Sequence, residues 1–235
     1  MTPDVPKRTK RATRYKNAGV EAKAKKVQLS PMNDNQALYI NAINTHDQVV
    51  VMGPSGTGKT FVAATVFANM YADKEIDKIV ITRPNVSVGK DLGYLPGTLE
   101  EKFTPWATPV LEVLQQQLGK GVVETAIKNG NIEMAPLSTM RGRSFKNAAI
   151  ILDEAQNLTI PEVKMFLTRI GENCKVVLNG DIYQSDIKEQ SGLSKIIHLA
   201  KKYNIDAVVV EFQLSDIVRS DICRQWLVAF MEEGI

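Results

Sequence analysis

A glycine-rich stretch near residue 55 constrains the fold of this chain more than any other feature of its sequence. Residues 49–62 read VVVMGPSGTGKTFV, and the segment from Gly53 to Thr60 fits the pattern G-x-x-x-x-G-K-[ST]. This pattern is typical of a loop that joins an apolar strand to a helix and binds phosphate groups through backbone N–H groups and the helix N-terminus. An apolar strand pattern precedes the loop and a helical pattern follows it. The sequence therefore predicts an α/β fold that binds a nucleotide.

Each residue type in this loop has a physical role. The three glycines allow the backbone conformations that turn N–H groups inward around the phosphates. The Lys59 ammonium is expected to reach the β- and γ-phosphates of ATP, and the Thr60 hydroxyl is expected to ligate Mg²⁺. We expect the nucleotide to contact the whole loop, that is Gly53, Pro54, Ser55, Gly56, Thr57, Gly58, Lys59, Thr60 and Phe61.

Strand and helix patterns alternate along most of the chain. Short segments rich in β-branched residues predict strands at 48–52, 78–82, 131–135, 148–152, 175–179 and 206–212. Helical spacing of apolar residues predicts helices at 33–45, 59–72, 98–118, 161–170, 192–203 and 216–233. Continuous apolar strands that alternate with helices indicate a mostly parallel sheet with helices on both faces. We expect residues 31–235 to form one such domain.

Two further strand ends carry polar residues suited to ATP hydrolysis. Residues 148–158 (AAIILDEAQNL) run from an apolar strand into Asp153 and Glu154, which predicts two carboxylates at the same sheet edge as the phosphate loop. Asp153 would hold Mg²⁺, and Glu154 would orient and deprotonate the attacking water. Residues 175–187 (KVVLNGDIYQSDI) bring Gln184, whose neutral amide suits a sensor of the γ-phosphate. Acids after a strand also serve as helix caps, and Gln184 also fits an ordinary polar turn.

The charge distribution separates the first thirty residues from the rest. Residues 1–30 hold nine Lys or Arg and two acidic residues, a net charge of +7, whereas the whole chain of 235 residues carries +3. So basic a segment with few large apolar groups is predicted to be a disordered arm, which either solubilises the protein or binds nucleic-acid phosphates. The two cysteines are far apart and suggest neither a disulfide framework nor a zinc site. No apolar run of signal-peptide or membrane-span length occurs, so we expect a cytoplasmic protein.

Beyond these motifs, the chain resembles a known family. The matching stretches are NQALYINAI, GPSGTGKT, ITRPNVSVGKDLGYLPGTLEEKFTPW, PLSTMRGRSF, IILDEAQN, VVLNGDIYQSDI and DIVRSDICRQWLVAF, which together span residues 33–230. They are similar to those of the PhoH-like proteins, phosphate-loop ATPases whose core resembles one RecA-like domain of superfamily 1 helicases. The resemblance implies a RecA-like fold, with ATP and Mg²⁺ as cofactors.

The resemblance also implies roles for individual residues. Gln36 is expected to contact adenine, and Arg219 is expected to be an arginine finger that stabilises the transferring phosphoryl group. Because the chain has room for one RecA-like domain, the facing cation would come from another subunit. This implies a homo-oligomeric ring, a hexamer by the resemblance, with Arg141 or Arg143 as the second candidate for the finger.

Basic residues in predicted loops suggest a track for single-stranded nucleic acid. Arg83, Lys90, Arg141 and Arg143 lie after strands or in turns, where their donors can reach phosphates. Tyr94, Phe103 or Trp106 are available for stacking on bases. Alternatively, the aromatic residues belong to the core or to a subunit contact, and the arginines make structural bonds.

Together these observations predict a Mg²⁺-dependent ATPase that couples hydrolysis to movement or unwinding of single-stranded nucleic acid, RNA rather than DNA. One alternative is a slow ATP-dependent switch on a nucleic-acid or protein partner. Another is a phosphotransferase with a phosphate-loop fold, although no Arg-rich lid is recognisable in the sequence.

Overall fold

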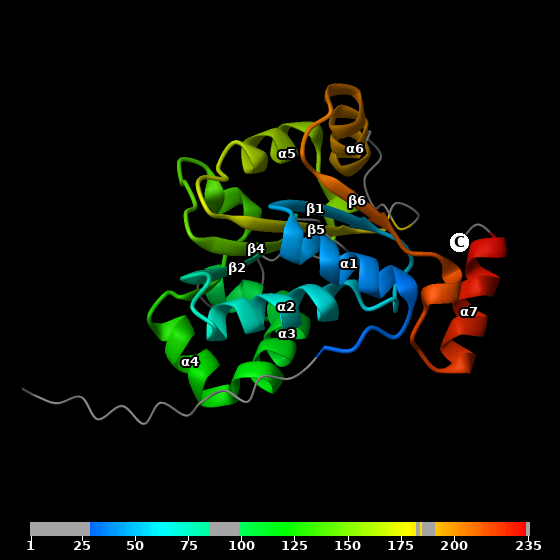
Figure 1. The fold of residues 1–235 in the computed structure, drawn as a ribbon, viewed down its shortest axis with the longest axis horizontal. Helices are drawn as coiled ribbons and strands as arrows, with labels where there is room; N and C mark the ends of the chain where they lie inside the picture. Colours follow the sequence, from blue (N-terminus) through cyan, green and yellow to red (C-terminus); the bar gives the residue numbers. More distant parts are fainter. Residues whose placement is uncertain (1–28, 85–98, 182–183, 185–190, 234–235) are drawn as a thin grey trace, which may run out of the picture.

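A six-stranded parallel sheet forms the centre of the computed structural model (Figure 1). The structure describes residues 29–84, 99–181, 184 and 191–233. The strands are β1 (Gln48–Met52), β2 (Lys78–Thr82), β3 (Ile132–Met134), β4 (Ala148–Leu152), β5 (Lys175–Gly180) and β6 (Val208–Glu211). Their order in the sheet is β3-β2-β4-β5-β1-β6, and every neighbouring pair is parallel. The predicted strands and the parallel sheet are thereby confirmed.

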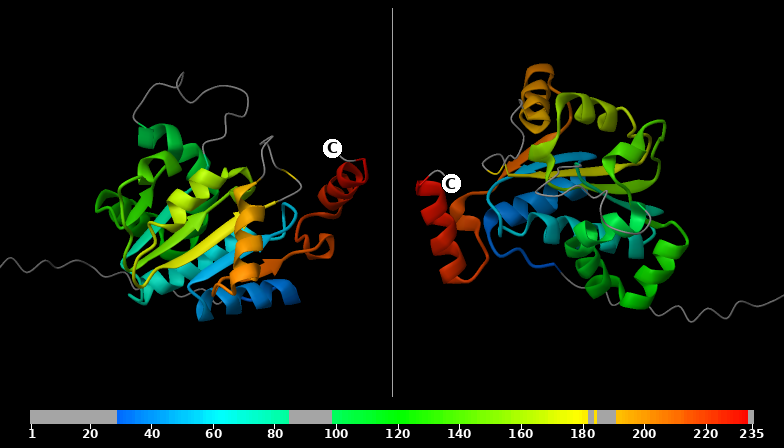
Figure 2. Two further views of the ribbon diagram at one scale, coloured as in Figure 1. Left: turned by 90° about the horizontal axis from the view of Figure 1, so that it is seen from above. Right: turned by 180° about the vertical axis from the view of Figure 1, so that it is seen from behind.

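Helices cover both faces of the sheet, as predicted. One face carries α1 (Asp34–Thr45), α2 (Lys59–Ala72), α3 (Leu99–Leu118) and α4 (Lys120–Lys128), and the other carries α5 (Ile160–Leu167) and α6 (Gly192–Tyr203). The last helix, α7 (Asp221–Glu232), lies apart from these layers, beyond one end of the sheet (Figures 1 and 2). No helix in the described part of the chain is long and apolar enough to span a membrane.

The central strands are apolar along most of their length because they contribute to two cores, one on each face of the sheet. In β1, Val49 and Val51 pack with α1 and α2, whereas Val50 and Met52 pack with the residues beneath α5 and α6. Successive side chains of a strand point to opposite faces. A strand that is covered on both faces therefore shows no polar alternation, which is the pattern that indicated the parallel sheet.

Helix α4 has no counterpart among the helices predicted from the sequence. Gly119 and Gly121 flank its first residue, and glycine lowers helix stability by about 1 kcal/mol per residue, which obscures the local signal. Val123 and Ala126 are buried in the same core as α3. Packing on the neighbouring helix thus stabilises a segment whose own propensity for helix is weak.

The last helix begins five residues later than predicted. Instead of a helix from residue 216, the chain forms a 3₁₀ turn at Leu214–Asp216 and then an irregular segment up to Ser220. The buried Asp216 carboxylate accepts hydrogen bonds from the Gln213 backbone N–H and the Asn35 side chain, both at 2.7 Å. These bonds hold the turn, and the residues after it run along the phosphate loop instead of entering a helix.

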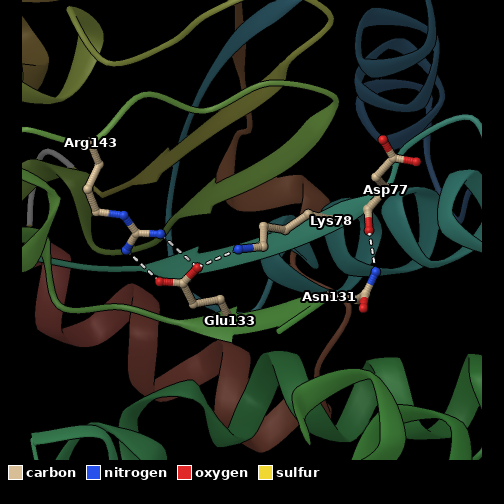
Figure 3. A network of polar contacts seen from close by, with 5 residues as sticks. All are labelled: Asp77, Lys78, Asn131, Glu133 and Arg143. Atoms are coloured by element: carbon tan, nitrogen blue, oxygen red, sulfur yellow. Dashed lines mark hydrogen bonds and ion pairs between the residues drawn. The ribbon is translucent and has the colours of Figure 1, made fainter. Parts of the chain in front are cut away.

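An ion-pair network at the β3 edge of the sheet includes Arg143, one of the residues singled out in the sequence (Figure 3). Both terminal nitrogens of Arg143 donate to the Glu133 carboxylate, and Lys78 Nζ donates to Glu133 Oε2 at 2.8 Å. The Arg143 hydrogen bond, with help from Lys78, lowers the pKa of Glu133 to about 2 against the opposing effect of burial. The sequence predicts that Arg143 contacts nucleic acid or serves as a second candidate finger. In the structure it is committed to Glu133, at the edge of the sheet opposite to β6 and four strands from β1, which leads into the phosphate loop.

We predict that Glu133→Gln destabilises the fold in a pH-dependent way. A carboxyl group whose pKa is lowered by folding stabilises the protein at pH values above its pKa in the unfolded state. This contribution is lost as the pH falls to its pKa in the folded state. The variant should therefore lose about 1–3 kcal/mol of unfolding free energy at pH 7, and the difference from wild type should shrink between about pH 4.5 and pH 2.

Urea unfolding from pH 7 downward measures this difference. Glu172→Gln is a matched control, because the Glu172 side chain is 85% exposed and its ion pair with Lys146, at 3.8 Å, is also on the surface. An equal and pH-independent loss in both variants would contradict the role assigned to the network.

Candidate functional site

A cavity of about 540 Å³ lies at the carboxyl ends of the central strands, beside the phosphate loop. Its walls come from segments that are far apart in the sequence: the loop after β1, the ends of β4 and β5, helix α3 and the segment before α7. Ligands of open parallel sheets bind at this edge. Of the predicted loop residues, six line the cavity, namely Ser55, Gly56, Gly58, Lys59, Thr60 and Phe61.

The remaining loop residues shape the loop from within. The carbonyl groups of Gly53 and Pro54 accept hydrogen bonds from Lys59 Nζ at 2.6 and 2.9 Å, and Thr57, which is buried, donates its hydroxyl to the Pro54 carbonyl at 3.0 Å. Burial lowers the pKa of Lys59, and the carboxylates of Asp181, Asp153 and Glu154 oppose this shift. The Lys59 side chain is thus held in the loop among acidic groups.

Thr60 and Asp153, predicted as metal ligands, lie next to each other. Thr60 Oγ1 is 3.3 and 3.5 Å from the two carboxylate oxygens of Asp153. Burial, and then the nearby charge of Glu154, raise the pKa of Asp153, whereas Arg83 and the Thr60 hydroxyl lower it. A hydroxyl and a carboxylate are the hard oxygen donors that Mg²⁺ prefers, and Mg²⁺ commonly takes its other ligands from phosphates and water. These two residues thus fit the predicted metal.

Two buried polar side chains that the sequence did not reveal connect to Thr60 through hydrogen bonds. The Tyr39 hydroxyl donates to Asn179 Oδ1 at 3.0 Å, and Asn179 Nδ2 lies 3.5 Å from Thr60 Oγ1. Both Tyr39 and Asn179 are buried, and burial raises the pKa of Tyr39 well above its usual value. Tyr39 therefore stays protonated and orients the Asn179 amide toward the hydroxyl of Thr60.

Glu154 follows Asp153 in an unusual backbone conformation. Its φ angle is 55°, in the left-handed region that residues other than glycine rarely adopt. Such conformations cluster at functional sites, where surrounding contacts maintain them. Glu154 lines the cavity beside Lys59 and Asp153, as the prediction of a catalytic base requires.

Gln184 also lines the cavity, and its side chain is exposed. Its backbone contacts Gln156, which follows the acid pair: the Gln184 carbonyl lies 3.4 Å from the amide nitrogen of Gln156. Gln156 and the buried Asp181 complete this wall, and the sequence motifs assign a role to neither of them. The available signal was their position: Gln156 is two residues after the acid pair, and Asp181 directly follows β5.

Gln36 lies at the other end of the cavity and is buried. Its amide nitrogen donates to the Thr57 carbonyl at 3.0 Å, and its amide oxygen accepts from the Met32 backbone N–H at 2.9 Å. The side chain thus ties α1 to the phosphate loop, and its second N–H and second lone pair are what it can offer to a base.

Apolar side chains also line the cavity. They are those of Phe61, Met32 and Leu29, together with Pro109 and Val113 from α3, which no sequence signal indicated. The charge pattern places Leu29 and Ser30 in the basic arm, but both line the cavity, and Leu29 packs against the core. The folded domain therefore begins at or before Leu29.

Arg219 lies over the phosphate loop of its own chain. The Val218 N–H donates to the Gly56 carbonyl at 3.0 Å, and a Cβ atom placed on Gly56 would come within 2.7 Å of Arg219 Cγ. Gly56 also has a φ angle of +83°, so both its conformation and this close approach require glycine. The family resemblance implies that Arg219 acts from a facing subunit. Within this single chain, Arg219 also lines the chain's own cavity.

The predicted nucleic-acid residues that the structure describes have different surroundings. The Arg83 guanidinium lies over the Trp106 ring, 4.3 Å from its centre. Arg141 is exposed at the end of the 3₁₀ helix Leu137–Met140. Lys90, Tyr94 and the side chain of Phe103 lie outside the described residues.

Comparisons with known proteins agree with this architecture. A family model described as PhoH-like protein matches residues 28–231. The chain is 41% identical over 204 residues to Protein PhoH of Escherichia coli K12, covering 84% of this chain and 57% of that protein. It is 38% identical over 216 residues to a PhoH-like protein of Bacillus subtilis 168, covering 91% and 66%. The chain thus spans less than two thirds of the length of these relatives.

A solved structure supports the fold class independently of sequence. The large terminase from a thermophilic bacteriophage matches 86% of this chain and 50% of its own with a TM-score of 0.54, at 12% identity. The fold is that of RecA-like phosphate-loop NTPases, as the sequence predicted.

Proposed function

Because the chain belongs to the PhoH-like protein family, we propose that it is a Mg²⁺-dependent ATPase that couples hydrolysis to binding, movement or unwinding of single-stranded nucleic acid, RNA rather than DNA. The observation that carries the ATPase proposal is the convergence on one cavity of Lys59, Thr60, Asp153 and Glu154 from two distant segments. Each group has the chemistry that one part of phosphoryl transfer to water needs.

In this mechanism the loop N–H groups and the N-terminus of α2 bind the phosphates. The Lys59 ammonium, which donates to the carbonyl groups of Gly53 and Pro54, would exchange these acceptors for phosphate oxygens. Thr60 and Asp153 would hold Mg²⁺, which supplies positive charge to the phosphate oxygens when bound. Glu154 accepts the proton of the attacking water. Gln184 is suited to sense the γ-phosphate, because its exposed amide lines the same cavity.

ATP is the proposed nucleotide. The apolar wall formed by Phe61, Pro109 and Val113 suits a base, and Gln36 retains one N–H and one lone pair for its edge. The GTPase specificity pattern Asn-Lys-x-Asp does not occur in the sequence.

Steady-state hydrolysis of ATP, measured with and without Mg²⁺ and with single-stranded RNA or DNA, tests the proposal. We expect Mg²⁺-dependent turnover that RNA stimulates more than DNA. A rate too slow to measure under every condition would instead favour the alternative, a slow conformational switch. Transfer of the γ-phosphate to an acceptor other than water would support a phosphotransferase.

The nucleic-acid role rests mainly on the basic arm of residues 1–30, most of which lies outside the described residues. The arm carries a net charge of +7. Arg143 is paired with Glu133 and Arg83 stacks on Trp106, so within the described residues Arg141 is the strongest remaining candidate for phosphate contact. We propose that the arm supplies most of the electrostatic affinity.

We predict that removing residues 1–28 weakens binding to single-stranded nucleic acid and reduces its salt dependence. Each phosphate contact contributes a slope of about −0.7 to log K against log salt, so losing a few contacts should flatten the plot by a few units. Fluorescence anisotropy with labelled RNA measures both quantities. Because Leu29 and Ser30 remain, the ATPase rate without nucleic acid should be unchanged.

A full-length variant with the nine basic arm residues changed to glutamine is the matched control for chain length. It should behave like the truncation. A slope equal to that of wild type in both variants would mean that the arm does not touch phosphate.

We also propose a homo-oligomer, a hexameric ring by family resemblance. The support from this chain is α7, whose described residues are all at least partly exposed. Ile222, Trp226 and Phe230 follow one another at helical spacing with 61%, 60% and 44% exposure, and the last two rings stack. Light scattering with and without nucleotide measures the assembly.

A further inference from the structure

Gln156 is a buried amide that touches the predicted base and the segment of the predicted sensor. It lies in the 3₁₀ helix Ala155–Asn157 that follows the acid pair, it is 1% exposed, and it borders the cavity. A buried amide must find partners for its donors and acceptors, so its hydrogen bonds indicate what it holds in place.

These partners come from both strand ends. Gln156 Nε2 donates to Glu154 Oε2 at 2.7 Å and lies 3.4 Å from the Gln184 carbonyl oxygen. Gln156 Oε1 accepts from the backbone N–H of Asp181 at 3.0 Å. Its own backbone carbonyl accepts from the Ser191 hydroxyl at 2.8 Å. Gln156, in the segment after β4, therefore connects Glu154 to residues that follow β5.

The partners fix the orientation of the amide. The Asp181 N–H can only donate, and an ionised Glu154 carboxylate can only accept. A flipped amide would place its oxygen against the carboxylate and its NH₂ group against the N–H, and both contacts are repulsive. The Gln156 nitrogen must therefore face Glu154 as long as Asp181 stays in place.

This orientation has a consequence for Glu154. Oxygen Oε2 is held by Gln156, which leaves Oε1 of the same carboxylate for a water molecule. A general base must lie within hydrogen-bonding reach of the proton that it takes, and a displacement of about 1 Å can lower the rate about 10²-fold. The left-handed conformation of Glu154 gives the side chain its direction, and the amide limits its rotation.

We infer that Gln156 is a positioning residue that holds the Glu154 carboxylate for catalysis and links its position to Asp181 and Gln184. This inference rests on the proposed ATPase function and deepens it. A nucleotide-dependent shift of Asp181 or of Gln184 would move the N–H or the carbonyl group that contacts the Gln156 amide, and so would change the alignment of the base.

The test is Gln156→Met, which keeps the length of the side chain and removes the amide. We expect kcat to fall about 10–100-fold, while KM for ATP and the Kd of a fluorescent ATP analogue stay within about twofold of wild type. Gln117→Met is the matched control, since Gln117 is a buried glutamine of α3 with 7% exposure that does not line the cavity. It should leave kcat unchanged, whatever it does to the melting temperature.

Two further variants separate positioning from a loss of structure. In a Glu154→Gln background, Gln156→Met should cause no additional loss in single-turnover rate, because the group that it positions is already gone. Gln156→Asn is milder for folding and covers the case in which the Met variant does not fold. Its shorter amide cannot reach Glu154 and Asp181 together, so kcat should fall here too with KM retained.

An active wild type with equally active Gln156→Met or Gln156→Asn variants would overturn the inference and leave the proposed function standing. So would losses that add fully to that of Glu154→Gln. A wild type that binds ATP without any turnover would overturn the proposed function, and the positioning role with it.

Discussion

Replacing Lys59 with alanine is expected to abolish ATP hydrolysis and to weaken nucleotide binding at the same time. The lysine is the one cation on the phosphate loop itself, and the acidic groups of Asp153, Glu154 and Asp181 face it. Without it, three carboxylates would remain beside the phosphates of ATP. We expect a fall in kcat on the order of 10²–10³-fold or more, together with a higher Kd for ATP.

Comparison with Glu154→Gln separates the effect on nucleotide binding from the effect on hydrolysis. This substitution preserves shape and removes the base, so turnover should fall by about 10²–10⁴-fold while ATP binding is retained. Lys164→Ala, which removes an exposed lysine on α5, controls for the loss of one positive charge. Titration with a fluorescent ATP analogue and steady-state kinetics measure the two effects separately. Equal loss of binding in the Lys59 and Glu154 variants would remove Glu154 from its assigned role.

Replacing Arg219 with alanine should lower kcat by about 10³-fold or more without large effects on the fold. Arginines that stabilise the transferring phosphoryl group contribute roughly 10³–10⁵ in rate. The Arg219 stem crosses Gly56, and the residue lines the cavity of its own chain. Arg224→Ala, an exposed arginine five residues further along, is the control and should retain activity.

The position of Arg219 also determines what subunit mixing should show. If Arg219 serves the nucleotide of its own chain, a mixture of Arg219→Ala and Glu154→Gln subunits contains no chain with both groups intact, and activity should not recover. Recovery after demonstrated subunit exchange would restore the original hypothesis that the arginine acts across an interface. Light scattering follows the exchange of subunits in the presence of nucleotide. Hydrolysis assays on the exchanged mixture then distinguish these results.

Short-range patterns were sufficient for much of the fold and for the centre of the site. The loop from Gly53 to Thr60 could be predicted because its function depends on consecutive backbone groups, so all of the required residues occur in one motif. The strands could be predicted because a sheet covered on both faces requires uninterrupted apolar runs. Asp153 and Glu154 could be placed beside the loop since parallel strands end at one sheet edge.

The predictions failed where contacts between distant segments determine the structure. Helix α4 has a weak local signal and forms because Val123 and Ala126 find a core to pack against. The sequence also did not indicate that Arg143 pairs with Glu133, ten residues earlier, at the edge of the sheet. No pattern around either residue indicates that the two side chains meet.

The sequence by itself therefore determined the fold class, the phosphate loop, the acid pair and the family. Tertiary structure decided which side chains support these groups: Tyr39 and Asn179 behind Thr60, Gln156 between Glu154 and Asp181, and Arg219 over Gly56 of its own chain. The physical reason is that a motif records interactions between neighbours along the chain, whereas a hydrogen bond between side chains depends on distances that exist only after the sheet has brought separate segments together.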